Sequence, residues 1–260
     1  MFHRDIDEKI KQRRMIITTS WDDGCKQDLK LSELLVRYGV KGTFYVSINP
    51  INSDIVPLDR SEIYILQDMG MEIGAHGVTH RVLPKLRYEE VLYEVAESKK
   101  YLEQLLGKQV ESFCYPKGKY SSMVLRAVQQ TGYLLGRTTV SFNTETSFAP
   151  FKMPVTFQFF PHKAEIHVRH ALKEGNIRGL TFWLFKLHME TDLIRLSDKL
   201  LEYILLHGGV LHVWGHSWEI ERFGLWDKLE EVLRIISGYN EVHYLTNAEV
   251  IKNIQQVRTI

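Results

Sequence analysis

The chain has 260 residues, of which 44% are hydrophobic and 25% charged, the balance of an ordinary soluble globular protein with a substantial core. Its formal net charge of +1 provides no bulk attraction to nucleic acid or to an anionic membrane, so we expect no nucleic-acid partner. A count of 2 cysteines excludes a disulfide scaffold, and we expect both thiols to be reduced.

Two segments bear on membranes and secretion. Residues 1–14 are charged throughout and lack the apolar core of a secretory signal, so we interpret them as an N-terminal extension and expect a cytoplasmic protein. Residues 179–196 form the most apolar long stretch, but charged side chains interrupt it, and we expect no membrane span. Residues 15–260 are then expected to form one domain.

Strand-like and helix-like segments alternate along most of the chain. The expected strands are residues 15–19, 40–47, 71–75, 110–115, 133–139, 154–160, 210–214 and 241–245. The expected helices are residues 26–38, a helix from the Asp59–Glu62 capping box to Gly70, residues 88–106, 121–131, two or three helices within 164–206, residues 225–236, and a C-terminal helix opened by Thr246 and Glu249. Repeated strand–helix units predict a parallel sheet, and about seven or eight of them favour a barrel.

Side chains that can carry chemistry follow the ends of three expected strands. The carboxyl ends of parallel strands meet at one face of a barrel, so we expect these residues to lie close together. Two imidazoles and one carboxylate can form a facial metal site, and a second carboxylate can serve as the base for a water held there. The pattern therefore indicates metal-assisted hydrolysis. The residues are Asp22, Asp23, His76, His80 and His216.

Several of these side chains also have an ordinary structural interpretation. Asp-Asp-Gly is common in turns, and a His-x-x-x-His spacing on its own is a weak signal. His212 lies deeper in its strand, where a hydrogen-bonded core role is favoured. Trp218 can stack on a sugar ring or pack in the core, and core packing is favoured for Trp214. Cys25 is either a soft metal ligand or a filler.

The order of the motifs resembles the polysaccharide deacetylase family of metal-dependent carbohydrate esterases. Asp-Asp-Gly, His-x-x-x-His, a Pro-x-Gly loop and a late strand ending in His succeed one another over residues 16–245. The resemblance implies an α/β fold, a single distorted, incomplete (β/α) barrel of about seven parallel strands, with residues 15–260 as its catalytic domain. It also implies a hydrolase that removes N-acetyl groups from an amino sugar in a glycan or glycoconjugate.

The resemblance implies a role for each matching residue. Asp23, His76 and His80 would bind a divalent metal ion, usually zinc. Water at that metal would attack the amide carbonyl, with Asp22 as the general base. His216 would be the acid that protonates the leaving amine, a role that suits an imidazole near neutral pH.

One motif departs from the family pattern. The family's Arg-x-Pro-Tyr is replaced by Cys114-Tyr115-Pro116-Lys117, so the Arg that orients the catalytic carboxylates is missing. We expect Arg137, at the end of the following strand, to take over this catalytic role, preferably through a bidentate pair with the base. The alternative is an ordinary surface or loop arginine.

The expected substrate contacts are Tyr115, Lys117 and Trp218, and Lys117 can offer its backbone N–H to the oxyanion whatever its side chain.

Two other functions remain open. Some superfamily members hydrolyse cyclic ureides or imides without the usual metal site, but the presence of both ligand histidines argues against this. An inactive carbohydrate-binding protein would not need Asp22 or His216, and both residues are present.

Overall fold

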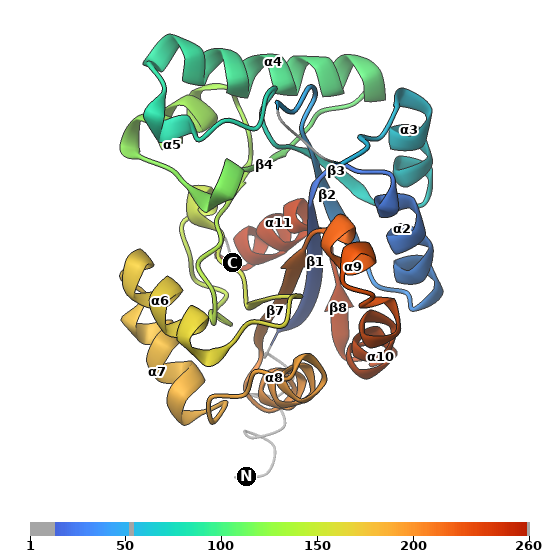
Figure 1. The fold of residues 1–260 in the computed structure, drawn as a ribbon, viewed down its shortest axis with the longest axis vertical. Helices are drawn as coiled ribbons and strands as arrows, with labels where there is room; N and C mark the ends of the chain where they lie inside the picture. The colour runs from blue at the N-terminus through green and yellow to red at the C-terminus, as the bar shows by residue number, and fades with distance from the viewer. Residues whose placement is uncertain (1–13, 52–54, 259–260) are drawn as a thin grey trace.

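The computed structural model describes residues 14–51 and 55–258. The predicted N-terminal extension therefore lies outside the described residues, apart from Arg14. The sheet has the strand order β5-β4-β3-β2-β1-β7-β6, with β8 beside β1 (Figure 1). All pairings between these strands are parallel, and helices flank the curled sheet. The predicted incomplete (β/α) barrel is thus confirmed.

Every predicted strand is present, although most are shorter than expected. The strands are β1 (Met15–Asp23), β2 (Gly42–Val46), β3 (Glu72–Ala75), β4 (Ser112–Cys114), β5 (Leu135–Arg137), β6 (Phe157–Gln158), β7 (Gly209–Gly215) and β8 (Val242–Tyr244). β1 and β7 are the exceptions: β1 runs four residues past its expected end at Thr19, and β7 is one residue longer at each end. β1 is long because strands on both sides pair with it: β7 pairs with residues 15–21, while the other edge pairs first with β8 and then, up to Asp23, with β2.

The helices match the predicted segments closely. They are α2 (Gln27–Arg37), α3 (Arg60–Asp68), α4 (Tyr88–Leu106), α5 (Ser122–Gln130), α6 (Ala164–Glu174), α7 (Ile177–Phe185), α8 (Leu193–His207), α9 (Ser217–Arg222), α10 (Trp226–Ile236) and α11 (Asn247–Arg258), with the short turns η1 (Leu83–Lys85), η2 (Pro116–Gly118) and η3 (Pro150–Lys152). The capping box of Asp59 and Glu62 is present. Helix α9 was not predicted, because a segment of six residues is too short to show helical periodicity.

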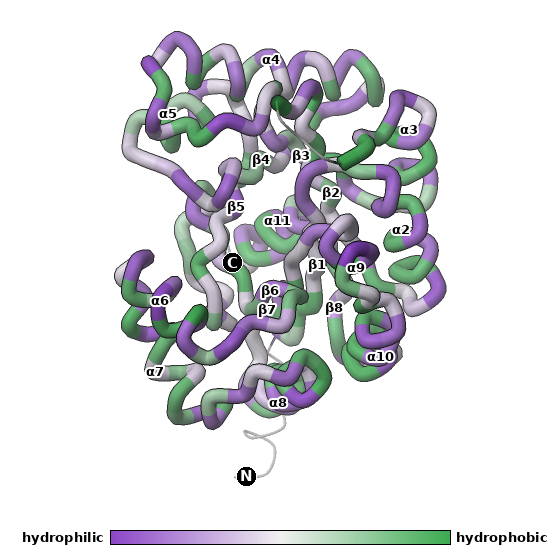
Figure 2. The backbone as a smooth tube through the Cα atoms, viewed as in Figure 1, coloured by the Kyte–Doolittle hydropathy of each residue, from purple (hydrophilic) through white to green (hydrophobic). Residues whose placement is uncertain are grey.

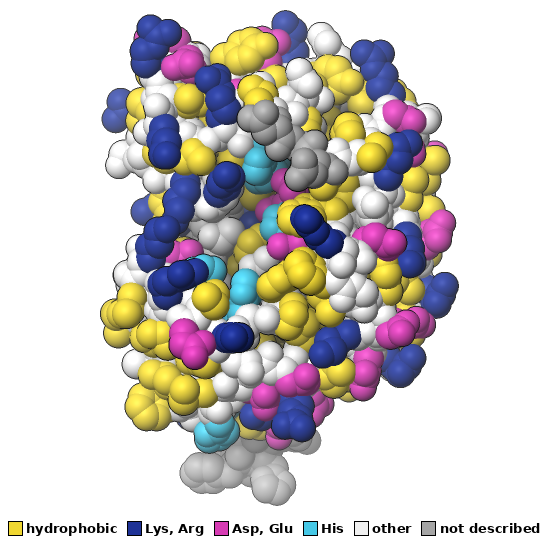
Figure 3. Space-filling model, in the orientation of Figure 1, with side chains coloured by type: hydrophobic (Ala, Val, Ile, Leu, Met, Phe, Trp, Pro, Cys, Tyr) yellow, Lys and Arg dark blue, Asp and Glu magenta, His cyan; other side chains and the backbone are white. Residues whose placement is uncertain are grey.

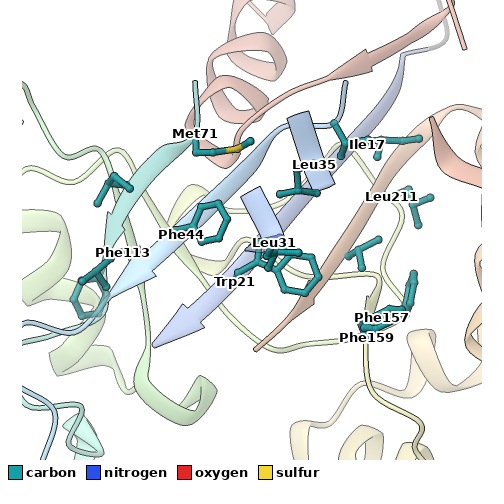
Figure 4. Close-up of a cluster of buried hydrophobic side chains, with 14 of the residues drawn as sticks. Ile17, Trp21, Leu31, Leu35, Phe44, Met71, Phe113, Phe157, Phe159 and Leu211 are labelled. Atoms are coloured by element: carbon teal, nitrogen blue, oxygen red, sulfur yellow. The ribbon is translucent and has the colours of Figure 1, made fainter. Parts of the chain in front are cut away.

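The outer face of the sheet packs against amphipathic helices, whose alternating hydropathy is visible along the tube in Figure 2. Odd-numbered residues of β1 point this way: Ile17 and Trp21 are fully buried and belong to the same core as Leu31 and Leu35 of α2 (Figure 4). Phe44 of β2 lies in the same cluster. None of the described helices is both long enough and apolar enough to cross a membrane.

Even-numbered residues of β1 belong to the interior of the barrel. Helix α11 closes the end of the barrel at which the strands start. Ile16 and Val210, near the starts of their strands, share a second core cluster with Val250 and Ile251 of α11. Because the strand starts are plugged in this way, a cavity can form only at the carboxyl ends of the strands. The C-terminal helix therefore determines which end of the barrel is open.

A buried polar layer lies above that apolar plug. The Thr18 hydroxyl donates to the Asn247 side chain (2.9 Å), and the Asn247 amide donates to the Tyr45 hydroxyl (2.9 Å). His212 contacts Ser20 through Nε2 (2.8 Å), and burial lowers the His212 pKa to about 3, so the ring is neutral. The expectation of a hydrogen-bonded core histidine is confirmed.

An irregular segment spans the gap between the two ends of the curled sheet. The Met153 amide donates to the Gly136 carbonyl of β5 (2.9 Å), and three residues later the Thr156 amide donates to the His212 carbonyl of β7 (2.9 Å). The segment leading into β6 thus supplies the backbone partners that a further strand would supply in a complete barrel.

We predict that Asn247→Ala destabilises the protein by about 2–4 kcal/mol, because it leaves two buried hydroxyls without a partner. Lys252→Ala on the same helix removes only an exposed ion pair with Glu111 and should cost at most about 1 kcal/mol. Urea denaturation followed by circular dichroism measures both values. Equal effects of the two variants would contradict the structural role assigned to the polar layer.

Candidate active site

The open end of the barrel holds a cleft of about 420 Å³ at the carboxyl ends of the strands. In Figure 3 it is a hollow with histidine and acidic side chains on its walls. The sequence analysis placed five candidate functional residues at three strand ends, and all of them line this cleft. They are Asp22, Asp23, His76, His80 and His216.

The backbone at the end of β1 directs the side chains of two adjacent aspartates to different places. Alternation along the strand places Asp22 in the barrel interior, where it is 3% exposed. Asp23 has a φ of 83°, in the left-handed region that residues other than glycine rarely adopt. This turn ends the alternation and brings the Asp23 carboxylate toward the histidines of the β3 loop.

Asp23, His76 and His80 bring their ligand atoms within 4.8 Å of one another. Oδ1 of Asp23 lies 3.3 Å from Nε2 of His80 and 3.7 Å from Nε2 of His76. A tetrahedral zinc ion with ligand bonds of about 2.0–2.1 Å would separate its donors by about 3.4 Å. The spacing and chemistry of these three donors therefore fit a divalent metal ion.

The backbone of a neighbouring strand orients the His76 ring. Nδ1 of His76 lies 2.8 Å from the carbonyl oxygen of Cys114, so Nδ1 carries the proton and Nε2 presents its lone pair to the site. Burial lowers the pKa of His76 to about 4, against the opposing effect of Asp22. A neutral imidazole is the form that binds a metal.

A second group of donors shares His76 and comprises Asp22, His76 and Cys114. Its chemistry is less suited to a cation. Burial raises the pKa of the Cys114 thiol well above its usual value, so it stays protonated, and it lies 3.6 Å from Oδ2 of Asp22 as a weak donor. Asp22 is already paired with a guanidinium, and a cation placed beside it would be repelled.

That guanidinium belongs to Arg137, at the end of β5. Arg137 is fully buried, and its Nη2 donates to Oδ1 of Asp22 across the barrel interior. Burial alone would raise the pKa of Asp22, but Arg137, His76 and His216 together lower it to about 2. The predicted proximity of Arg137 to Asp22 is thus present, and the alternative of a surface arginine is excluded.

The pairing differs in detail from the preferred bidentate form. Only Nη2 of Arg137 contacts the carboxylate, while Nε and Nη1 are buried without a hydrogen-bond partner. Instead, the guanidinium carbon lies 5.1 Å from the ring centroid of Tyr45 and 5.0 Å from that of Trp214. Arg137 is therefore held by one hydrogen bond and two aromatic faces. Trp214 is 8% exposed, in line with the favoured core packing, and it also lines the cleft.

His216 follows β7 and forms a dyad with a carboxylate that the sequence analysis missed. Nδ1 of His216 lies 2.7 Å from Oε2 of Glu219 on α9, while Nε2 lies 4.0 Å from Oδ2 of Asp23. Burial would lower the pKa of His216, but the Glu219 hydrogen bond and the charges of Asp23 and Asp22 raise it to about 9. The spacing of three residues was a usable sequence signal for this pair.

The dyad continues into a longer chain of hydrogen bonds. Nε2 of Gln158 donates to the same Glu219 oxygen (3.3 Å), and Oε1 of Gln158 accepts from Nε2 of His162 (2.9 Å). Because the carboxylate can only accept, this chain orients the Gln158 amide and requires the proton of His162 on Nε2. Glu219 is thereby held toward His216 from its other side.

Trp218 has a role that neither of its predicted interpretations included. Its indole Nε1 donates to Oδ2 of Asp23 (2.9 Å), which leaves Oδ1 of Asp23 directed at the histidines. The ring also lines the cleft. Trp218 therefore orients a candidate metal ligand, as partners of metal ligands commonly do.

A buried carboxylate on α4 braces the loop between His76 and His80. Oε2 of Glu94 accepts from the backbone amides of Val78 and Thr79, both at 2.8 Å, and Oε1 accepts from the Thr79 hydroxyl. His80 has a φ of 58°, a left-handed backbone that needs such support. No sequence signal distinguished Glu94 from the other acidic residues of its helix.

The remaining predicted residues are placed less uniformly. Lys117 lines the cleft and has a φ of 57°. Tyr115 is fully buried and does not line the cleft. Its hydroxyl donates to the carbonyl of Phe151 (2.9 Å). Cys25 is also buried, with Sγ 2.9 Å from the Ser217 hydroxyl, and it belongs to neither group of metal donors found among the described residues. Both cysteines are free thiols.

Comparisons of the fold agree with this architecture. A polysaccharide deacetylase structure from Mycobacterium smegmatis superposes with a TM-score of 0.67 at 14% identity, covering 95% of this chain and 92% of that one. A family 4 acetyl xylan esterase from Clostridium thermocellum, in complex with a cobalt ion, has a TM-score of 0.56 at 15% identity, covering 92% and 91%. At these identities the likeness establishes the fold.

Sequence comparison finds relatives of the first half of the chain. YxkH of Bacillus subtilis (strain 168), named as a polysaccharide deacetylase, is 28% identical over 134 residues. This match covers 51% of the present chain and only 47% of the relative. The family model described as polysaccharide deacetylase matches residues 9–136, which contain the Asp-Asp-Gly and His-x-x-x-His motifs. Residues 9–136 of the chain thus match the polysaccharide deacetylase family.

Proposed function

We propose that the protein is a metal-dependent hydrolase that removes N-acetyl groups from an amino sugar. The observation that carries the proposal is the arrangement around Asp22. This carboxylate is kept ionised by Arg137 beside a separate set of three metal donors, and the His216 imidazole, paired with a carboxylate, lies 4.0 Å from Asp23 of that set. Two adjacent aspartates with different environments suit two different tasks.

The metal would be held by Asp23, His76 and His80, and zinc suits this set of one carboxylate and two neutral imidazoles. When bound, a divalent ion polarises an amide carbonyl and lowers the pKa of water. The protein's own contribution is to fix the ligands. The Cys114 carbonyl holds the tautomer of His76, and the Trp218 indole holds Asp23.

Asp22 is placed to take the proton of the attacking water. Its pKa of about 2 keeps it in the accepting form at any physiological pH. The Arg137 hydrogen bond to Oδ1 leaves Oδ2 as the oxygen available for that proton, since its other neighbour is a weak thiol donor. Asp22 thus acts as general base while Arg137 fixes its orientation and charge.

His216 is placed to give a proton to the leaving amine nitrogen. Glu219 holds Nδ1, so Nε2 faces the cleft. With the pKa raised to about 9, the ring is protonated near neutral pH and can act as an acid. The backbone N–H of Lys117 is our candidate for the contact to the oxygen of the tetrahedral intermediate. Proton transfer from water to Asp22 and from His216 to the amine completes the cleavage to acetate and a free amine.

We predict that His76→Ala and His80→Ala each abolish stoichiometric zinc binding, because the remaining donors cannot complete the site. His243→Ala, which changes an exposed histidine on β8, should retain about one zinc per chain. Metal content after dialysis, measured by mass spectrometry, checks this. Full zinc occupancy in either ligand variant would refute the proposed metal site.

The roles of Asp22 as base and His216 as acid can be tested separately from the metal site. Asp22→Asn and His216→Ala should keep their zinc but lose roughly 10²–10⁴ in kcat, the usual contribution of a general acid or base. Acetate release from N-acetylated chito-oligosaccharides, at matched metal content, measures the loss. A variant with a kcat near that of the wild type would contradict the role proposed for the residue it changes.

The stacked geometry of Arg137 predicts that Arg137→Lys fails nearly as badly as Arg137→Ala, with a loss of about 10²-fold or more in kcat. An ammonium group cannot lie flat between Tyr45 and Trp214 while donating to Asp22. Thermal melts and zinc content of both variants separate catalytic loss from misfolding. A folded, zinc-loaded Arg137→Lys protein with wild-type kcat would show that a point charge suffices.

A further inference from the structure

The cleft extends beyond the catalytic groups toward η2 and α6. Its far wall is formed by Lys119, which follows η2, and by His167, His170 and Lys173 of α6, with His162 just before that helix. We call Lys119, His167, His170 and Lys173 the far subsite. The cavity of about 420 Å³ is larger than an acetamide group requires, so this end can hold another part of the substrate.

The far end of the cleft carries a net positive charge. Lys119 and Lys173 line it, and among the described residues neither has a carboxylate oxygen within 4.0 Å. The opposing carboxylate is Glu174, which accepts a hydrogen bond from the Thr139 hydroxyl (3.3 Å). In Figure 3, dark blue lysine and arginine side chains gather along the α5 and α6 side of the hollow. An exposed set of unneutralised cations facing a concave wall attracts anions.

The imidazoles add hydrogen-bond donors to this positive field. The ring centroid of His162 lies 5.7 Å from that of His167 and 5.8 Å from that of His170. Burial lowers the pKa of His170. The positive charges of Arg169, Lys173 and Lys119 lower it further, because they oppose protonation of the ring. An anion bound here would relieve this repulsion and accept N–H hydrogen bonds.

We propose that the far subsite binds an anionic substituent, a phosphate or a carboxylate, on the N-acetylated sugar. Asp22 and Asp23 line the same cleft, so repulsion keeps the anion away from them and directs the acetamide toward the catalytic groups. The inference rests on the proposed deacetylase function and specifies its substrate class as acidic N-acetyl sugars.

Ligands without an acetamide group test the subsite independently of catalysis. Calorimetric titration of the zinc-loaded protein compares glucose with glucose 1-phosphate and with glucuronate, which separates phosphate from carboxylate recognition. We expect at least one of the two anions to bind roughly tenfold more tightly than glucose. The double variant Lys119→Gln/Lys173→Gln should lose this preference, and Glu174→Gln should increase it.

The matched control is Lys163→Gln, because Lys163 is exposed at the start of α6 and does not line the cleft. It should keep the full preference. Equal affinity for glucose and both anions would overturn the subsite. So would a preference that survives in the double variant, because the anion would then be held by the metal rather than by the lysines.

Acetate release separates this inference from the proposed function. The ratio of kcat/KM for N-acetylglucosamine 1-phosphate and N-acetylmuramic acid to that for N-acetylglucosamine should follow the binding preference and fall about tenfold in the double variant. Lysine-dependent anion binding without acetate release from any of these sugars would support the subsite and contradict the deacetylase function. Acetate release with equal kcat/KM for all three sugars would support the function and overturn the subsite.

Discussion

The ion pair between Arg137 and Asp22 is the constraint on which the rest of the site depends. The two residues come from β5 and β1, which lie four positions apart in the sheet order, so the pair spans the barrel interior. Both side chains are buried, and losing either partner would leave an uncompensated charge at a cost of several kcal/mol. The pair therefore keeps Asp22 ionised and occupied, which leaves the neighbouring aspartate for the metal-binding role that we propose.

The division of labour between the two aspartates follows from backbone geometry. Strand alternation carries Asp22 inward to Arg137, and the left-handed φ of 83° at Asp23 turns the next carboxylate toward His76 and His80. The Trp218 indole N–H then donates to Oδ2 of Asp23. Two identical side chains, adjacent in sequence, thus have surroundings that differ in charge, burial and hydrogen bonding.

Much of this arrangement could be predicted because it depends on local pattern and topology. Strand–helix alternation predicted the barrel, and parallel strand ends predicted that Asp22, His76 and His216 would meet. Arg137 was found because few arginines follow a strand near the altered motif. Contacts made by helices could not be predicted in this way, since the brace from Glu94 depends on how α4 packs. Tyr115 shows the converse error, because matching the motif did not reveal that its ring is buried.

The central claim is that Arg137 reserves Asp22 as the base and leaves the metal to Asp23 and the two histidines. X-ray absorption at the zinc K-edge of the zinc-loaded protein tests it most directly, because the competing donor group contains the Cys114 sulfur. The account predicts only nitrogen and oxygen neighbours, at about 2.0–2.2 Å. A sulfur neighbour at about 2.3 Å would place the ion on Cys114 beside Asp22 and contradict the assignment of base and ligand.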